Sequence, residues 1–176
     1  MPIINPNFKK NKKVYLFKCF VALIAMIFVL LSLQLVASNI VLGAIGASSL
    51  ASSIFVAFAM PDSAAAHPKR MVGSYAISIV LGIVCYYFGT YLLIMQNILS
   101  FSLTYELVGA LAVTATMLCM ILFSFEHPPA TGLALGLVIE PWQGWTILII
   151  ILAIIGIATI KTLVSPWLLS DSPHEE

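Results

Sequence analysis

The stretch Glu126-His127-Pro128-Pro129-Ala130-Thr131-Gly132 decides the fold, because it interrupts a long apolar region with charge and two prolines. A proline disfavours the helical conformation of the residue before it, so the pair predicts an extended backbone at His127 and Pro128. Pro129, by contrast, suits the first position of a helix, where an amide hydrogen would have no partner. The stretch therefore predicts the end of one helix and the start of another.

The composition places this interruption in a membrane protein. Hydrophobic residues make up 61% of the 176-residue chain, charged residues make up 9%, and the mean hydropathy is +1.09. Soluble domains are about half apolar and a quarter charged. Since a crossing needs roughly 20 apolar residues, we expect an all-α polytopic transmembrane bundle of about five full crossings plus a half-length helix.

The apolar runs and turn residues give the expected segments. Full crossings are predicted over residues 14–37, 40–60, 71–95, 107–125 and 145–164, and the half-length helix over 130–139. Residues 61–63 form a turn, 64–70 a loop and 96–104 an uncharged connection. We thus predict one transmembrane domain, 14–165, between a basic tail, 1–13, and a short acidic tail, 166–176.

Basic residues predict the orientation. Four lysines precede the first apolar run, which is too long for a cleaved signal peptide, so we expect a retained helix with a cytoplasmic N-terminus. Lys69 and Arg70 place the 64–70 loop on the same side. The last helix ends outside if the half-length helix dips and returns, and inside, as Lys161 favours, if it helps to complete a crossing. These features predict a multi-pass protein of a bacterial inner membrane or an equivalent membrane.

The helix start after the prolines outlines an anion site. The first amides of a helix lack partners within it, and the helix dipole makes this end positive. We expect the amides of Thr131 and Gly132 to face His127, which can gain a proton near neutral pH. Glu126 would oppose an anion unless it is protonated or paired. Alternatively, Glu126 and His127 mark a wetted helix end.

Other candidate residues lie upstream of the prolines. His67, Lys69 and Arg70 would add positive charge from a loop on the same side of the membrane. Ser48 and Ser49 lie on a segment that also holds Ser52 and Ser53, four residues further on. This spacing suits either close helix packing, with hydroxyls bonded to their own backbone, or a strip facing a polar cavity. Glu106 suits an interfacial cap of the fourth crossing.

An ordered set of motifs resembles the HPP family of integral membrane proteins. The set comprises Gly43-Ala44-Ile45-Gly46-Ala47-Ser48, Pro61, Ala66-His67-Pro68-Lys69-Arg70, Gly73, and His127-Pro128-Pro129 followed by small residues. Members of this family are associated with nitrite transport in chloroplasts and cyanobacteria. The resemblance implies a transporter or channel for a small monovalent anion, with nitrite the first candidate, held by His127, the amides after Pro129 and the serine-rich segment.

A competing class is a non-transporting membrane subunit that packs against partner proteins through the small residues of the third crossing, Gly73 and Gly82 among them. An enzyme is disfavoured because the sequence lacks a nucleophile motif, a phosphate loop and a metal-spaced set of histidines or cysteines. We predict no cofactor and no metal. The net charge of +1 disfavours a nucleic-acid partner. The expected partners are the bilayer and the anion, and the small bundle is consistent with a homo-oligomer.

Overall fold

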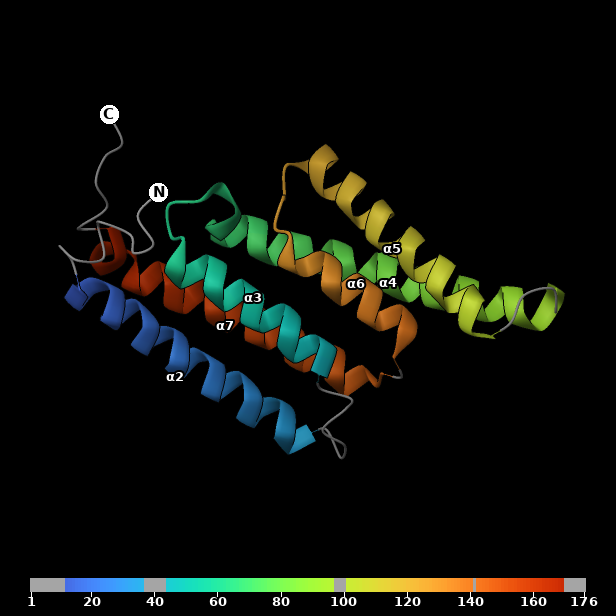
Figure 1. Cartoon of the computed structure of the whole chain (residues 1–176), viewed down its shortest axis with the longest axis horizontal. Helices are drawn as coiled ribbons and strands as arrows, with labels where there is room; N and C mark the ends of the chain where they lie inside the picture. The colour runs from blue at the N-terminus through green and yellow to red at the C-terminus, as the bar shows by residue number, and fades with distance from the viewer. Residues whose placement is uncertain (1–11, 37–43, 97–100, 141, 170–176) are drawn as a thin grey trace, which may run out of the picture.

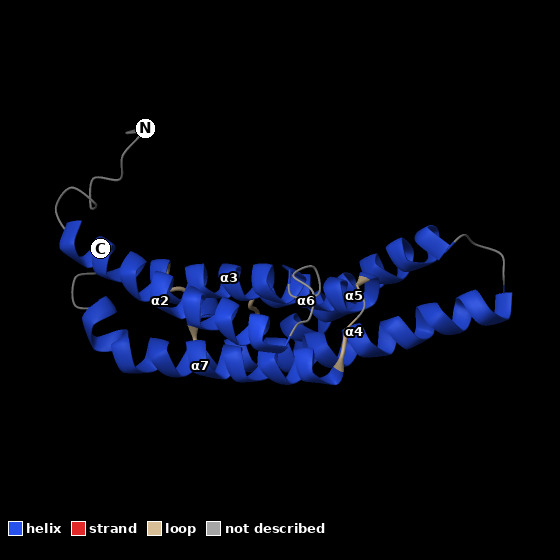
Figure 2. Cartoon of the chain, turned by 90° about the horizontal axis from the view of Figure 1, so that it is seen from below, coloured by secondary structure: helices blue, strands red, loops and turns tan. Residues whose placement is uncertain are grey.

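The computed structural model describes residues 12–36, 44–96, 101–140 and 142–169. Within these segments the chain is helical and has no strand (Figure 2). The helices are α2 (Lys12–Val36), α3 (Ala44–Ala59), the 3-10 turn η2 (Ala64–Ala66), α4 (Pro68–Gln96), α5 (Phe101–Phe123), α6 (Pro129–Ile139) and α7 (Gly144–Leu169). Most of the predicted N-terminal tail, and the C-terminal tail beyond residue 169, lie outside the described residues.

Four described helices are long and apolar enough to cross a bilayer, namely α2, α4, α5 and α7. The other two α-helices are shorter: α3 has 16 residues and α6 has 11, or about 24 and 16 Å. The all-α architecture and the half-length helix after the prolines are confirmed. The predicted second crossing corresponds to α3, which ends before Pro61 and does not reach spanning length within the described residues.

The short helix α6 lies at the centre of the bundle (Figure 1). It packs against α3, α4 and α5, while α7 and α2 cover the other side of α3. Small residues allow the close contacts: a Cβ atom built on Gly82 of α4 would lie 2.9 Å from Leu137 Cβ and 3.1 Å from the Ala134 carbonyl oxygen of α6. Many large apolar side chains on the outer faces are exposed, as lipid contact requires.

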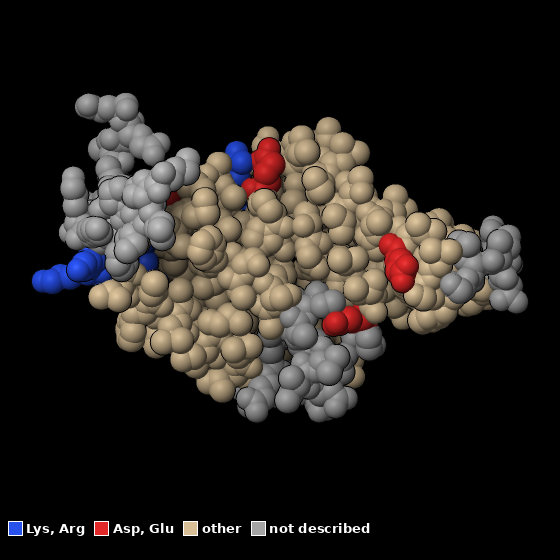
Figure 3. Space-filling view, viewed as in Figure 1, with Lys and Arg blue, Asp and Glu red and all other residues tan. Residues whose placement is uncertain are grey.

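Charged side chains are sparse on the face shown in Figure 3. The start of α2 and the end of α7 lie at the same end of the bundle (Figure 1). The described lysines and arginine lie in the first two turns of α2, in the first turn of α4 and toward the end of α7; they are Lys12, Lys13, Lys18, Lys69, Arg70 and Lys161. The described positive charge thus lies on the part of the bundle that holds the starts of α2 and α4 and the end of α7 (Figure 1).

Three predicted boundaries away from the prolines were wrong. Helix α4 begins at Pro68, so Lys69 and Arg70 lie in its first turn and not in a loop, since Pro68 occupies the same favourable first position as Pro129. Helix α5 begins at Phe101, which places Glu106 beyond the first turn. There it accepts a 2.7 Å hydrogen bond from the Ser102 hydroxyl, so it is not an N-terminal cap.

The third wrong boundary is the end of α7. This helix continues through Pro166 to Leu169, because the hydrogen bond that a proline cannot make is lost only in the last turn. The described part of the predicted acidic tail is therefore helical.

The close contact at Gly82 gives a stability prediction. Gly82→Ala would drive a methyl group against Leu137 Cβ and a backbone carbonyl, neither of which can rotate away. We expect it to destabilise the protein by about 1–3 kcal/mol, as overpacking does. The control is Gly156→Ala on α7, where an added Cβ meets nothing within 4 Å. Unfolding in detergent, followed by circular dichroism, should show a lower midpoint for Gly82→Ala than for the wild type, and no decrease for Gly156→Ala. A Gly82→Ala midpoint equal to that of the wild type would contradict this packing.

Candidate functional site

Helix α5 ends before the stretch 126–132 that holds the two prolines. Ser124 adopts a left-handed φ of 56°, and the amides of Ser124 and Phe125 donate to the carbonyls of Ile121 and Met120. This is the Schellman arrangement, and it ends α5 at Phe123, earlier than the proline argument predicted. The Phe125 ring then packs at Gly73 of α4, where an added Cβ would lie 2.9 Å away. The connection is thereby fixed to α4.

The prolines themselves behave differently from each other. Pro129 is the first residue of α6, as predicted, but Pro128 has φ −50° and ψ −37°, a right-handed helical conformation. The expected extended conformation of Pro128 is therefore wrong. Its helical backbone brings the Pro128 carbonyl into reach of both the amide and the hydroxyl of Thr131, at 3.1 and 2.8 Å. Tertiary packing overrides the local proline preference here.

These bonds also change the expected anion site at the start of α6. The Ala130 amide donates to the His127 carbonyl at 3.0 Å, and the Thr131 amide donates to Pro128. Thr131 therefore does not present a free amide to His127, as the sequence had predicted. Gly132 is exposed, and an added Cβ there would meet nothing within 4 Å. In this conformation the first helical amides are occupied by the turn itself.

His127 is fully buried, and both of its ring nitrogens have partners. Nδ1 lies 2.8 Å from the Ala65 carbonyl oxygen of η2, and Nε2 lies 2.8 Å from the Ser53 hydroxyl of α3. Because a carbonyl can only accept, Nδ1 carries a proton. Burial lowers the pKa of His127, and the bond to Ala65 partly opposes this by favouring the protonated ring.

Further hydroxyls extend this contact into α4 and α6. The Tyr75 hydroxyl lies 2.8 Å from both the Ser53 and the Ser49 hydroxyls, and Ser49 donates to the Pro129 carbonyl at 2.7 Å. We call the series Pro129 carbonyl, Ser49, Tyr75, Ser53, His127 and Ala65 carbonyl the His127 chain. It joins α3, η2, α4 and α6 through polar atoms inside an apolar bundle.

The carboxylate next to His127 is paired. Arg70, in the first turn of α4, donates to Glu126 at 2.6 Å, and both side chains are partly exposed. The sequence left open whether Glu126 is protonated or paired, and the structure shows it paired. The positive charge of Arg70 reduces the repulsion between Glu126 and an anion. Such a part-exposed pair adds little stability, about 1 kcal/mol or less.

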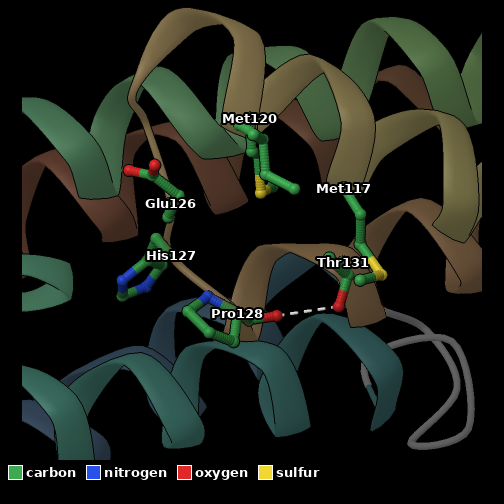
Figure 4. A pocket seen from close by; sticks show the side chains of 7 residues that line it. Met117, Met120, Glu126, His127, Pro128 and Thr131 are labelled. Carbon is green, nitrogen blue, oxygen red and sulfur yellow. Dashed lines mark hydrogen bonds between the residues drawn. The ribbon is translucent and has the colours of Figure 1, made fainter.

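A pocket of about 170 Å³ adjoins the histidine and the ion pair. In Figure 4, Met117 and Met120 of α5 approach it from one side, and Pro128 and Thr131 lie opposite. Ile121, Glu126 and His127 complete the lining. A water molecule accounts for about 30 Å³ of liquid, so this pocket has room for an ion of a few atoms with some hydration.

Several sequence-predicted residues do not line this pocket. Ser48, His67 and Lys69 are exposed. The two serine pairs behave differently. The Ser52 hydroxyl donates to the Ser48 carbonyl of its own helix, as the packing alternative expects, whereas Ser49 and Ser53 join the His127 chain. Among the described residues, no three His, Cys, Asp or Glu side chains gather to hold a metal ion.

Sequence reasoning missed Tyr75 and the Ala65 carbonyl as members of the His127 chain. It placed Ser53 one helical turn after Ser49 but left open whether their strip packs against a helix or faces a polar cavity. Tyr75 carried a weak signal, since it lies seven residues after Pro68 and so shares a face with the start of α4. Nothing in the sequence indicated that the Ala65 carbonyl accepts from His127.

The different partners of Ser53 and Ser52 predict different losses of stability on substitution. Ser53→Ala removes the partner of a buried imidazole and of a buried tyrosine hydroxyl, so we expect about 1–3 kcal/mol of destabilisation. Ser52→Ala removes one exposed bond to its own backbone and should change the unfolding free energy by less than about 0.5 kcal/mol. Denaturant unfolding of both variants measures the difference. A Ser53 variant as stable as the wild type would show that the contact with His127 contributes nothing.

The comparisons with known proteins agree with the motifs. The family model described as "HPP, transmembrane region" matches residues 10–170, which is most of the chain. No curated protein and no solved structure matches it. With its four candidate spans and its His127-Pro128-Pro129 junction, in which His127 is buried, the chain belongs to the HPP family of integral membrane proteins.

Proposed function

We propose that this protein carries a small monovalent anion across a membrane, with nitrite the first candidate. The observation that supports this best is the His127 chain, a run of hydroxyl and imidazole groups buried between the two short helices α3 and α6. Polar groups are expensive inside a bilayer and are therefore candidates for function there. Paired short helices near the middle of a bundle are also typical of transporter binding sites.

The pocket beside His127 suits an anion better than a cation or a large solute. Its carboxylate, Glu126, is paired with Arg70, and the neighbouring ring can gain a positive charge. The methionine side chains on the α5 side are flexible and polarisable, so they can adapt to a small guest. The chain would bind the anion through His127 and Ser53, after a rearrangement that exposes them to the pocket.

No observation favours the competing class of a non-transporting subunit. Under that hypothesis, Gly73 and Gly82 belong to the surface that contacts partner proteins. Both glycines face the interior of this chain instead, toward Phe125 and Leu137. Substituting them would disrupt the bundle itself, so loss of a partner after such changes would not identify a partner surface.

Nitrite flux provides the direct test. Purified protein in liposomes should accumulate nitrite down an imposed gradient, and His127→Ala should lower the rate at least tenfold because it removes the centre of the polar chain. Ser52→Ala is the matched control, since its hydroxyl bonds only its own helix, and its rate should equal that of the wild type. Absence of nitrite flux through wild-type protein under any gradient, relative to protein-free liposomes, would remove the proposal.

We also propose that the end of the bundle carrying the described lysines and arginine faces the cytoplasm, as the positive-inside rule expects. On this proposal the end of α7 faces the cytoplasm too, because it lies at the same end of the bundle as the start of α2 (Figure 1). Asp62→Cys in a cysteine-free background places a thiol in the exposed turn after α3. A membrane-impermeant maleimide should label it in inside-out vesicles and spare it in intact cells. Labelling in intact cells would reverse the orientation.

A further inference from the structure

The ends of the His127 chain are both acceptors. At one end the Pro129 carbonyl lies 2.7 Å from Ser49, and at the other the Ala65 carbonyl lies 2.8 Å from His127 Nδ1. Between them, Ser49 to Tyr75, Tyr75 to Ser53, and Ser53 to His127 Nε2 are each 2.8 Å apart. Each of these five contacts is short enough to need a proton between its two atoms.

The neutral chain holds too few protons for these contacts. Ser49, Tyr75, Ser53 and a neutral His127 each supply one, which makes four for five contacts. If Ser49 donates to Pro129, Tyr75 must donate to Ser49 and Ser53 must donate to Tyr75. No proton then remains for the contact with Nε2. Other arrangements only move the missing proton to another contact, where two lone pairs face each other.

One added proton completes the series. An imidazolium donates from Nδ1 to Ala65 and from Nε2 to Ser53, and the three hydroxyls then donate in order toward Pro129. All five contacts become hydrogen bonds, and each hydroxyl donates once. Ser53 also lies 3.1 Å from the Ser49 carbonyl, a longer contact that its single proton can share. No covalent bond forms or breaks except the new N–H bond at Nε2.

The surroundings of His127 oppose its protonation, although protonation would complete the hydrogen bonds. Helix α3, η2 and α6 bring no charged residue to the ring, and α4 brings Tyr75 and, through Glu126, the guanidinium of Arg70. Farther away, Lys161 of α7 interacts electrostatically with Asp62. Burial without a counter-charge disfavours the imidazolium, so the ring is neutral at pH 7 and takes its proton on the acid side of its ordinary range, about 6.5.

We infer that the His127 chain is a binding site for one proton, and that this proton accompanies the transported anion. The first part rests on the hydrogen-bond geometry, and the second rests also on the proposed function. A proton and a monovalent anion together carry no net charge, which lowers the cost of moving the pair through an apolar bundle. Protonation also makes His127 a cation at the pocket that it lines.

Histidine NMR tests the proton site without any transport. The chain has three histidines, so ¹⁵N-histidine labelling of the protein in nanodiscs gives few signals, and His127→Gln assigns one set. We expect the Nδ1-protonated neutral ring at high pH and a doubly protonated ring on acidification. Tyr75→Phe should lower the midpoint by about one pH unit, roughly the effect of one hydrogen bond, because breaking the chain lets the neutral state satisfy every contact.

Tyr75 makes no hydrogen bond to His127, so a purely pairwise account predicts no shift in this variant. Ser49→Ala breaks the chain one link farther from the ring and should lower the midpoint in the same direction, which covers a failure of Tyr75→Phe to fold. Ser52→Ala should leave the midpoint unchanged. A ring that stays neutral wherever the protein is folded, or equal midpoints in wild type and both chain variants, would overturn the proton site.

Proton movement tests the coupling. Liposomes holding a pH-sensitive dye should acidify during nitrite uptake by the wild-type protein, beyond the rate of protein-free liposomes, with about one proton per anion. Titration of His127 without any nitrite flux would leave the proton site standing and remove the anion function. Nitrite flux without proton movement would instead overturn the coupling and leave anion transport in place.

Discussion

The need to satisfy both nitrogens of a buried imidazole organises the centre of this protein. In water the ring would find partners anywhere, but inside a bilayer each unpaired polar atom costs several kcal/mol. His127 meets the requirement with a backbone carbonyl of η2 and a hydroxyl of α3, and the hydroxyls then find partners on α4 and α6. Segments far apart in sequence are thus held in one register by polar contacts, while apolar packing supplies the bulk of the contact area.

The same contacts explain why the short helix can occupy the middle of the bundle. Helix α6 is too short to span and is buried by α3, α4 and α5. Its small residues, and the glycines of α4 and α5 that face it, let the backbones approach closely. A helix with larger residues at these positions would be pushed outward, and the Pro129 carbonyl would then lose Ser49.

Much of this arrangement was predictable from local sequence, and the rest was not. The apolar runs predicted the all-α bundle, and Pro129 predicted the start of α6 almost to the residue, because helix starts depend on local backbone chemistry. The end of α5 was misplaced because Ser124 adopts a left-handed conformation that is uncommon outside glycine. The partnership of Tyr75 with Ser49 and Ser53 depends on how helices pack, which one sequence does not encode in any local pattern.

The shortness of α6 has a consequence for the surrounding lipid. This helix measures about 16 Å, against about 30 Å for a hydrocarbon core. A helix of this length in contact with lipid would thin the bilayer around it. Because α3, α4 and α5 enclose α6, the lipid meets mainly its longer neighbours, and the bilayer is spared that deformation.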